Sequence, residues 1–172
     1  MRRTAGLRMI SLMAAVLVAL LAAGVASAKG AHAGDSQAER RVLSVRLIPD
    51  LGPKVEPAIA GIAPGGLPWV LTSGHANVSA GGLVEVSVEG LLLGPGSPEN
   101  LVGTTGPVAN VAASVACANG GIVTTSAVAL SKLGNAHIHQ KVALPSHCVG
   151  AVVLVRAVFA DNAGPWIAVS GF

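Results

Sequence analysis

The residues best suited to chemistry are two histidines separated by a single residue, His137 and His139. On a β-strand, side chains two positions apart lie on the same face, so the two imidazoles could chelate zinc or copper together. His75 or His147 could supply a third ligand, but Lys141 would place a positive charge beside the metal. We therefore predict two solvated histidines and no cofactor. A small extracellular metal-binding protein that uses His137 and His139 is the alternative.

Two candidate catalytic motifs do not meet the requirements of catalysis, one because of its spacing and one because of its sequence context. Glu85 and Glu89 are four residues apart on one predicted strand face, which separates them by roughly 13 Å at about 3.3 Å per residue. Glycosidase carboxylates are only ~5 to 9.5 Å apart. Residues 34–36, Gly-Asp-Ser, imitate the start of a serine-hydrolase motif, but they lie in a polar stretch without a preceding strand. We therefore expect no catalytic residue and no enzyme.

Short alternating segments must position the histidines. In residues 83–89, Val84, Val86 and Val88 alternate with polar side chains, which predicts a half-buried strand. The other predicted strands cover residues 69–73, 108–117, 122–130, 136–144, 151–159 and 166–171. This pattern predicts an all-β fold, an Ig-like antiparallel β-sandwich of about seven strands with Greek-key connections. A small closed barrel is the alternative, because strand number alone does not determine closure.

The first 28 residues have the pattern of a signal peptide. Three arginines precede an uncharged, mainly apolar run over residues 9–25, and Ala26-Ser27-Ala28 is a small-x-small cleavage motif. Cleavage would leave 144 of the 172 residues, with eight of the eleven basic side chains against eight acidic ones. We therefore predict a secreted or cell-envelope protein with no membrane span after cleavage. An uncleaved N-terminal anchor is the alternative.

The predicted mature chain is neutral and contains only two Trp, two Phe and no Tyr. Nucleic-acid binding depends on basic patches and aromatic stacking, so we predict no nucleic-acid partner. Both cysteines, Cys117 and Cys148, lie in the exported part, where oxidising conditions allow one intramolecular pairing. Cys117 shares its predicted strand face with Val111 and Val115, so its sulfur should face the core. We predict a Cys117–Cys148 disulfide.

The exported chain divides into two parts. Residues 29–66 have mixed composition and four prolines, and we predict a flexible leader in which residues 42–48 could add an edge strand. Residues 67–172 hold the predicted β-sandwich domain. Trp69 and Trp166 begin its first and last strands within two copies of the motif P-W-[VI]-x-x-S-G. We expect the two Trp side chains to fill the core at opposite ends of the sandwich, with a coincidental match as the alternative.

Several of these segments together resemble a loosely defined group of uncharacterised secreted bacterial proteins, especially of actinobacterial type. The resemblance lies in residues 61–69, 84–91, 144–148 and 166–172 and in Cys117. It implies export and a single-disulfide β domain, and it implies no activity. We predict a non-catalytic module with a binding or structural role toward an unknown extracellular or envelope partner.

Overall fold

The computed structural model describes residues 40–52 and 56–171, and these residues form eleven β-strands and no helix. Accordingly, no helix within these ranges could cross a membrane. The predicted signal peptide, residues 1–28, and the first part of the predicted leader lie outside the described residues. The prediction of an all-β fold is confirmed.

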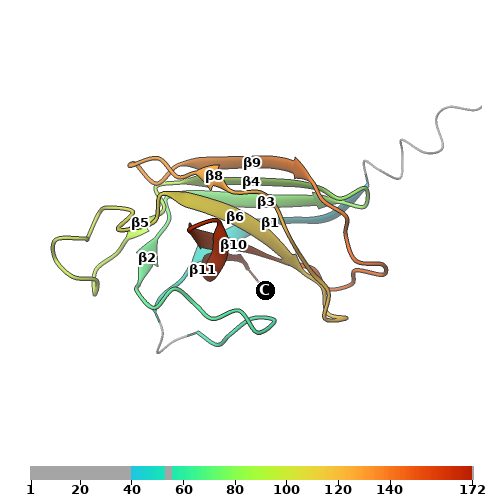
Figure 1. Ribbon diagram of the computed structural model, residues 1–172, viewed down its shortest axis with the longest axis horizontal. Helices are drawn as coiled ribbons and strands as arrows, with labels where there is room; N and C mark the ends of the chain where they lie inside the picture. The colour runs from blue at the N-terminus through green and yellow to red at the C-terminus, as the bar shows by residue number, and fades with distance from the viewer. Residues whose placement is uncertain (1–39, 53–55, 172) are drawn as a thin grey trace, which may run out of the picture. The chain divides into compact units, whose positions relative to one another are not determined.

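Nine strands form one antiparallel sheet with the order β7-β6-β10-β11-β1-β3-β4-β9, and β8 pairs with β6 beside β7 (Figure 1). A separate two-stranded sheet joins β2 to β5. The strands are β1 (Arg41–Pro49), β2 (Trp69–Val70), β3 (Ser73–Ser79), β4 (Leu83–Glu89), β5 (Leu92–Leu93), β6 (Asn110–Ala116), β7 (Ile122–Thr124), β8 (Val128–Ala129), β9 (Ala136–Lys141), β10 (Val152–Phe159) and β11 (Asn162–Ser170).

Strand β1 turns the sheet into a curled half-barrel. Its residues Arg41 to Arg46 pair with β3, whereas Leu47 to Pro49 pair with β11. The strands β3, β4 and β9 therefore lie opposite β6, β10 and β11, as Figure 1 shows. The result is a sandwich-like arrangement with one core between the two halves.

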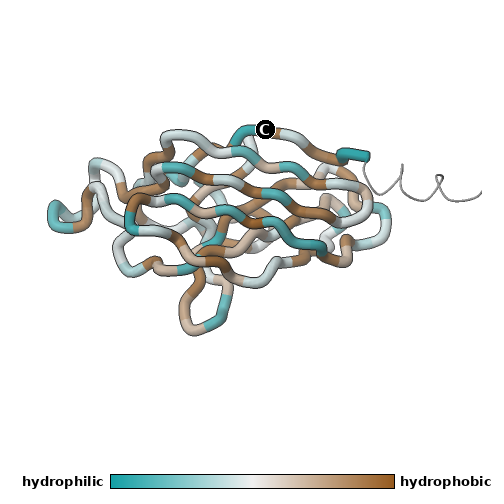
Figure 2. Tube along the Cα trace, turned by 90° about the horizontal axis from the view of Figure 1, so that it is seen from above, coloured by the Kyte–Doolittle hydropathy of each residue, from teal (hydrophilic) through white to brown (hydrophobic). Residues whose placement is uncertain are grey.

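Alternation along the strands builds this core, as predicted. Apolar and polar residues alternate visibly along neighbouring strands in Figure 2. Side chains from both halves of the sheet are almost completely buried in one cluster, among them Val84, Val86, Val88, Val111, Ala113, Val115, Ile138, Val153, Val155 and Ala157. Short Val and Ala side chains dominate the cluster, which explains how a chain with few aromatic residues fills its interior.

The prediction of an edge strand near residues 42–48 was wrong, because β1 has hydrogen-bonded neighbours on both sides. Leu43, Val45 and Leu47 pack against the main core and tie both halves of the sheet to it. The sequence analysis missed β3, since the strand that we predicted over residues 69–73 covers β2 and ends at Ser73, where β3 begins. Only Ala76 and Val78 of β3 are buried and apolar, so its pairing depends on its neighbours.

Residues 56–66 cover the outer face of β10 and β11, although we predicted a flexible leader there. Ile59 and Ile62 exchange backbone hydrogen bonds of 3.0 and 2.9 Å and pack against buried residues of the two strands. These buried residues are Leu154, Trp166 and Val169. The few apolar residues of the segment are thus enough to form a third layer, which we call the covering segment (residues 56–66).

The predicted arm over residues 122–130 is split into β7 and β8. Between them, Ser126 donates its N–H to the Gln140 side-chain oxygen at 2.8 Å, and the Gln140 amide nitrogen donates to the Ser126 carbonyl at 3.3 Å. Gln140 belongs to β9, at the opposite end of the strand order. This side chain therefore links the two outermost parts of the curled sheet.

The predicted disulfide is confirmed. Cys117 and Cys148 are bonded, and their Cα atoms are 5.0 Å apart. Cys117 is buried directly after β6, and Cys148 packs against the main core from the loop that follows β9. The bond therefore attaches this loop to the half of the sheet that contains β6.

Candidate functional site

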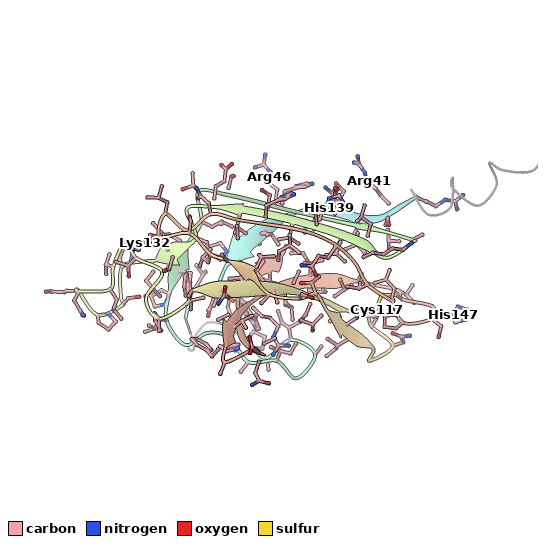
Figure 3. The ribbon with its side chains drawn as sticks, turned by 45° about the horizontal axis from the view of Figure 1, so that its top comes forward. Arg41, Arg46, Cys117, Lys132, His139 and His147 are labelled. Atoms are coloured by element: carbon pink, nitrogen blue, oxygen red, sulfur yellow. A yellow bond between two sulfur atoms is a disulfide. The ribbon has the colours of Figure 1, made fainter. Side chains whose placement is uncertain are left out.

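The outward side chains of β1, β3, β4 and β9 form a continuous polar surface, which we call the polar face. Its strand positions are Arg41, Ser44, Arg46, Ser73, His75, Asn77, Glu85, Ser87, Glu89, His137, His139 and Lys141. No described segment is packed over this face in the way that the covering segment is packed over β10 and β11. In Figure 3, Arg41, Arg46 and His139 project from the same side of the molecule.

Strand register arranges the polar face in rows. One row runs Arg46, His75, Ser87 and His137, and the neighbouring row runs Ser44, Asn77, Glu85 and His139. Adjacent strands are about 4.8 Å apart, so four residues in a row span about 14 Å. The face thus extends across four strands, with three histidines among hydroxyl, amide and charged groups.

His137 and His139 lie side by side on β9, as predicted. Their ring centroids are 6.3 Å apart, and the Nδ1 atom of His139 lies 3.0 Å from the Glu85 Oε1 atom. Both members of the His139–Glu85 contact are substantially exposed, so the pair adds little stability. Its effect is to orient the His139 ring, with Nε2 left for another partner.

Neither histidine predicted as a third ligand joins His137 and His139: His75 contacts other side chains, and His147 lies far away. The Nε2 atom of His75 lies 3.3 Å from both the Ser44 Oγ atom and the Asn77 Oδ1 atom. His147 lies away from His139 in Figure 3, on the loop beside the disulfide. Among residues 40–52 and 56–171, no three metal-ligating side chains come together.

The Ser44–His75 contact pairs a hydroxyl with an imidazole, as hydrolases do. The same ring nitrogen also faces the Asn77 amide oxygen, and both contacts are exposed to solvent. In a catalytic triad, a carboxylate orients the other ring nitrogen of the histidine. None of the hydrogen bonds of the described side chains provides such a carboxylate for His75.

Two shallow hollows interrupt the polar face. One of about 350 Å³ lies where β1, β3, β4 and β9 meet, and it is lined by Arg41, Asn77, Val78, Ser79, Gly81, Leu83, Glu85 and Lys141. The other, of about 500 Å³, is lined by Arg46, Leu47, Leu71, Thr72, Ser73, Gly74, His75 and Ser87. Each contains at least one cationic side chain, and the second has no carboxylate among its lining residues.

A buried carboxylate that the sequence analysis missed lies on the other side of the core. Asp50 is completely buried, and its two oxygens accept the N–H groups of Gly52 at 2.7 Å and Gly65 at 2.6 Å. Burial raises the pKa of Asp50, and these hydrogen bonds lower it in part. The pKa of Glu56 is also raised, by burial and then by the charge of Asp50. Only the pattern Asp-x-Gly before Gly65-Gly66 could have indicated this site.

Asp50 also connects the two Trp motifs. Its N–H donates to the Ile167 carbonyl at 3.0 Å, and its carbonyl accepts the Trp69 N–H at 2.7 Å. Trp69 is buried in the main core, whereas Trp166 is buried beneath the covering segment. The two motifs therefore meet around one residue, and the prediction that they occupy opposite ends of the sandwich was wrong.

Comparisons of the chain with protein-family models, with curated proteins and with solved structures found no match.

Proposed function

We propose that this protein is an exported, non-catalytic Ig-like β-sandwich module that binds a partner through its polar face. The observation that carries the proposal is the contrast between the two outer surfaces of the curled sheet. The covering segment buries apolar side chains over β10 and β11, whereas the strands β1, β3, β4 and β9 present polar side chains to solvent. A solvent-facing array of hydroxyl, amide, imidazole and charged groups suits hydrogen bonding to a polar partner.

Export is supported by the signal-peptide pattern and by the disulfide, which is consistent with an extracellular location. The resemblance to secreted proteins of actinobacterial type agrees with the same proposal. The His75 contacts in the described part of the chain are to the Ser44 hydroxyl and the Asn77 amide, which differs from a catalytic triad, where a carboxylate orients the histidine.

Site-specific cross-linking tests the proposed surface. A photoreactive amino acid at Ser87, in the centre of the polar face, should form a covalent adduct with a partner at the surface of the producing cells. The same amino acid at Ala58, an exposed position on the covering segment, serves as the matched control. An excess of the unlabelled mature protein should suppress the Ser87 adduct. Equal adducts from both positions, or no adduct from Ser87, would contradict the proposal.

A metal-binding protein is the second candidate, because Glu85 orients the ring of His139 in the way that carboxylates orient metal-bound histidines. A metal at a hundred times its dissociation constant would stabilise the fold by about 2.7 kcal/mol, which raises the melting temperature by several degrees. We expect equal melting temperatures with zinc, with copper and with chelator. A rise that disappears in the His137→Ala, His139→Ala double variant would instead establish the second candidate.

A further inference from the structure

The 500 Å³ hollow on the polar face lies at the point where the sheet divides. Arg46 is the last residue of β1 that pairs with β3, opposite His75, and from Leu47 onward β1 pairs with β11. The first residues of β3, Ser73 and Gly74, pair only with β4. The strands separate here, and the resulting depression has an apolar base of Leu47 and Leu71 below a polar rim.

The rim carries an arginine without a carboxylate partner among the described residues. The one ion pair within residues 40–52 and 56–171 joins His139 to Glu85, so none of the described carboxylates lies within 4.0 Å of the Arg46 guanidinium. A guanidinium group presents a planar set of N–H donors that matches the oxygens of phosphate and sulfate. Ser87 adds a hydroxyl from the neighbouring strand.

His75 provides a second donor whose charge depends on pH. Its Nε2 atom lies 3.3 Å from both the Asn77 Oδ1 atom and the Ser44 Oγ atom. Protonation of an imidazole makes both ring nitrogens donors and adds a positive charge, here on the residue paired with Arg46 across β1 and β3. The charged and titratable groups on the same face around His75 are Arg46 on β1 and Glu85 and Glu89 on β4, with His137 one strand further away on β9.

Glu89 lies beside the hollow, and its negative charge weakens the attraction between the hollow and an anion. Its Oε2 atom accepts a hydrogen bond of 3.0 Å from the Ser73 hydroxyl at the rim. With His75 neutral, Arg46 is the one charged side chain among the residues that line the hollow, and protonation of His75 adds a second positive charge beside Glu89. An anion should therefore bind more strongly when His75 is protonated, and binding should in turn favour that protonation.

From this geometry we infer that the hollow between Arg46, His75 and Ser87 is an oxyanion subsite. It takes a phosphate or sulfate group, either as a free ion or as part of a polymer, and its affinity increases as His75 gains a proton. This inference rests on the proposed function, because it names the chemistry of the ligand that the polar face recognises.

Sulfate is the appropriate probe, because its charge is constant over the range in which histidines titrate. We expect a ¹H–¹⁵N NMR titration of the oxidised mature protein to show shifts confined to the residues that line the hollow. Binding should be at least about fivefold tighter at about pH 5.5 than at about pH 8. Chloride at the same ionic strength should not reproduce these shifts. Shifts spread over all basic residues would overturn the inference.

Two variants, each with a matched control, test the roles of Arg46 and His75 in sulfate binding. Arg46→Gln should abolish sulfate binding at both pH values, whereas Arg41→Gln, at the other hollow, should leave it unchanged. His75→Gln should remove the increase at low pH and retain the binding at high pH. His137→Gln, in the same row, should retain both. Unchanged binding in Arg46→Gln, or a retained pH dependence in His75→Gln, would overturn the inference.

Inorganic phosphate, sulfated dextran and uncharged dextran distinguish the sources of the ligand. Much tighter binding of sulfated dextran than of either free ion would identify a polymer, and equal binding would identify the free ion. If none of the anionic probes binds but Ser87 still cross-links to a partner, the oxyanion subsite is wrong and the proposed binding face stands. If the anionic probes bind but Ser87 forms no adduct, the oxyanion subsite stands and the proposed binding face is wrong.

Discussion

At the scale of single residues, Asp50 has the greatest influence on the structure. It accepts two backbone N–H groups with its side chain and joins Trp69 to Ile167 through its own backbone. A Cβ atom at Gly65 would lie only 3.2 Å from the Asp50 carboxylate and 3.0 Å from Ile167, which explains why a glycine occupies this position. The carboxylate therefore holds the covering segment against the sheet.

We predict that Asp50→Ala lowers the free energy of unfolding by about 2–4 kcal/mol, because it leaves the buried N–H of Gly52 and the part-buried N–H of Gly65 without this acceptor, and an unsatisfied buried donor costs about 1–3 kcal/mol. Urea unfolding at neutral pH measures the loss. Glu99→Ala, an exposed acidic residue in a loop, is the control and should change stability little. A loss of equal size in both variants would contradict this role.

Glu56 should act in the opposite direction. Because its pKa is raised in the folded state, its ionised form lowers stability at neutral pH, and the loss is relieved as the pH falls through the folded pKa. We predict a higher melting temperature for Glu56→Gln than for the wild type at about pH 7, with a difference that shrinks toward about pH 4. Thermal unfolding at both pH values tests this, with Glu99→Gln as control. A difference that is the same at both pH values would exclude the electrostatic explanation.

At the scale of elements, β1 is indispensable because it pairs with both β3 and β11. We predict that a chain beginning at Leu67 has no cooperative thermal transition, since it would lack both β1 and the covering segment. A chain beginning at Arg40 should unfold cooperatively, because it retains all the strands that the structure describes. Circular dichroism measures both transitions. Similar melting temperatures for the two chains would show that residues 67–172 fold alone.

The Gln140 side chain links β9 to the segment between β7 and β8. Gln140→Ala removes both hydrogen bonds to Ser126, and we expect it to lower the free energy of unfolding by about 1–2 kcal/mol. Hydrogen exchange of the Ser126 amide should accelerate in the same variant. His139→Ala, one residue earlier on the polar face, should leave that exchange rate unchanged. Slow exchange in Gln140→Ala would mean that other contacts hold β8 beside β9.

At the scale of the whole molecule, the disulfide closes a loop with a sequence separation of 31 residues. The chain-entropy relation gives about 3.7 kcal/mol for a loop of this length. We predict that the Cys117→Ala, Cys148→Ala double variant loses about 2–4 kcal/mol of stability in urea unfolding. The two single variants in reducing buffer provide the control, since neither can form the bond. No difference between the oxidised wild type and the double variant would contradict a stabilising role.

Features that depend on neighbours along the chain were predictable from the amino-acid sequence. Alternation in residues 83–89 and 108–117 identified strands and their inner faces, because side chains of a strand alternate with a period of two. The same rule placed His137 and His139 together on an outward face, as the structure has them. The pairing of Cys117 with Cys148 was predictable because the chain contains only two cysteines.

Only the tertiary structure decided which strands lie inside the sheet and which of its faces is covered. β1 and β3 have weak or mixed patterns, and their positions depend on partners far away in the sequence. Asp50 showed nothing unusual in the sequence, because its hydrogen bonds to Gly65 and Ile167 join segments that fold together only in three dimensions. The hollow beside Arg46 likewise arises where β1 passes from β3 to β11. Such a divergence of strands is a property of sheet topology, and local periodicity carries no information about it.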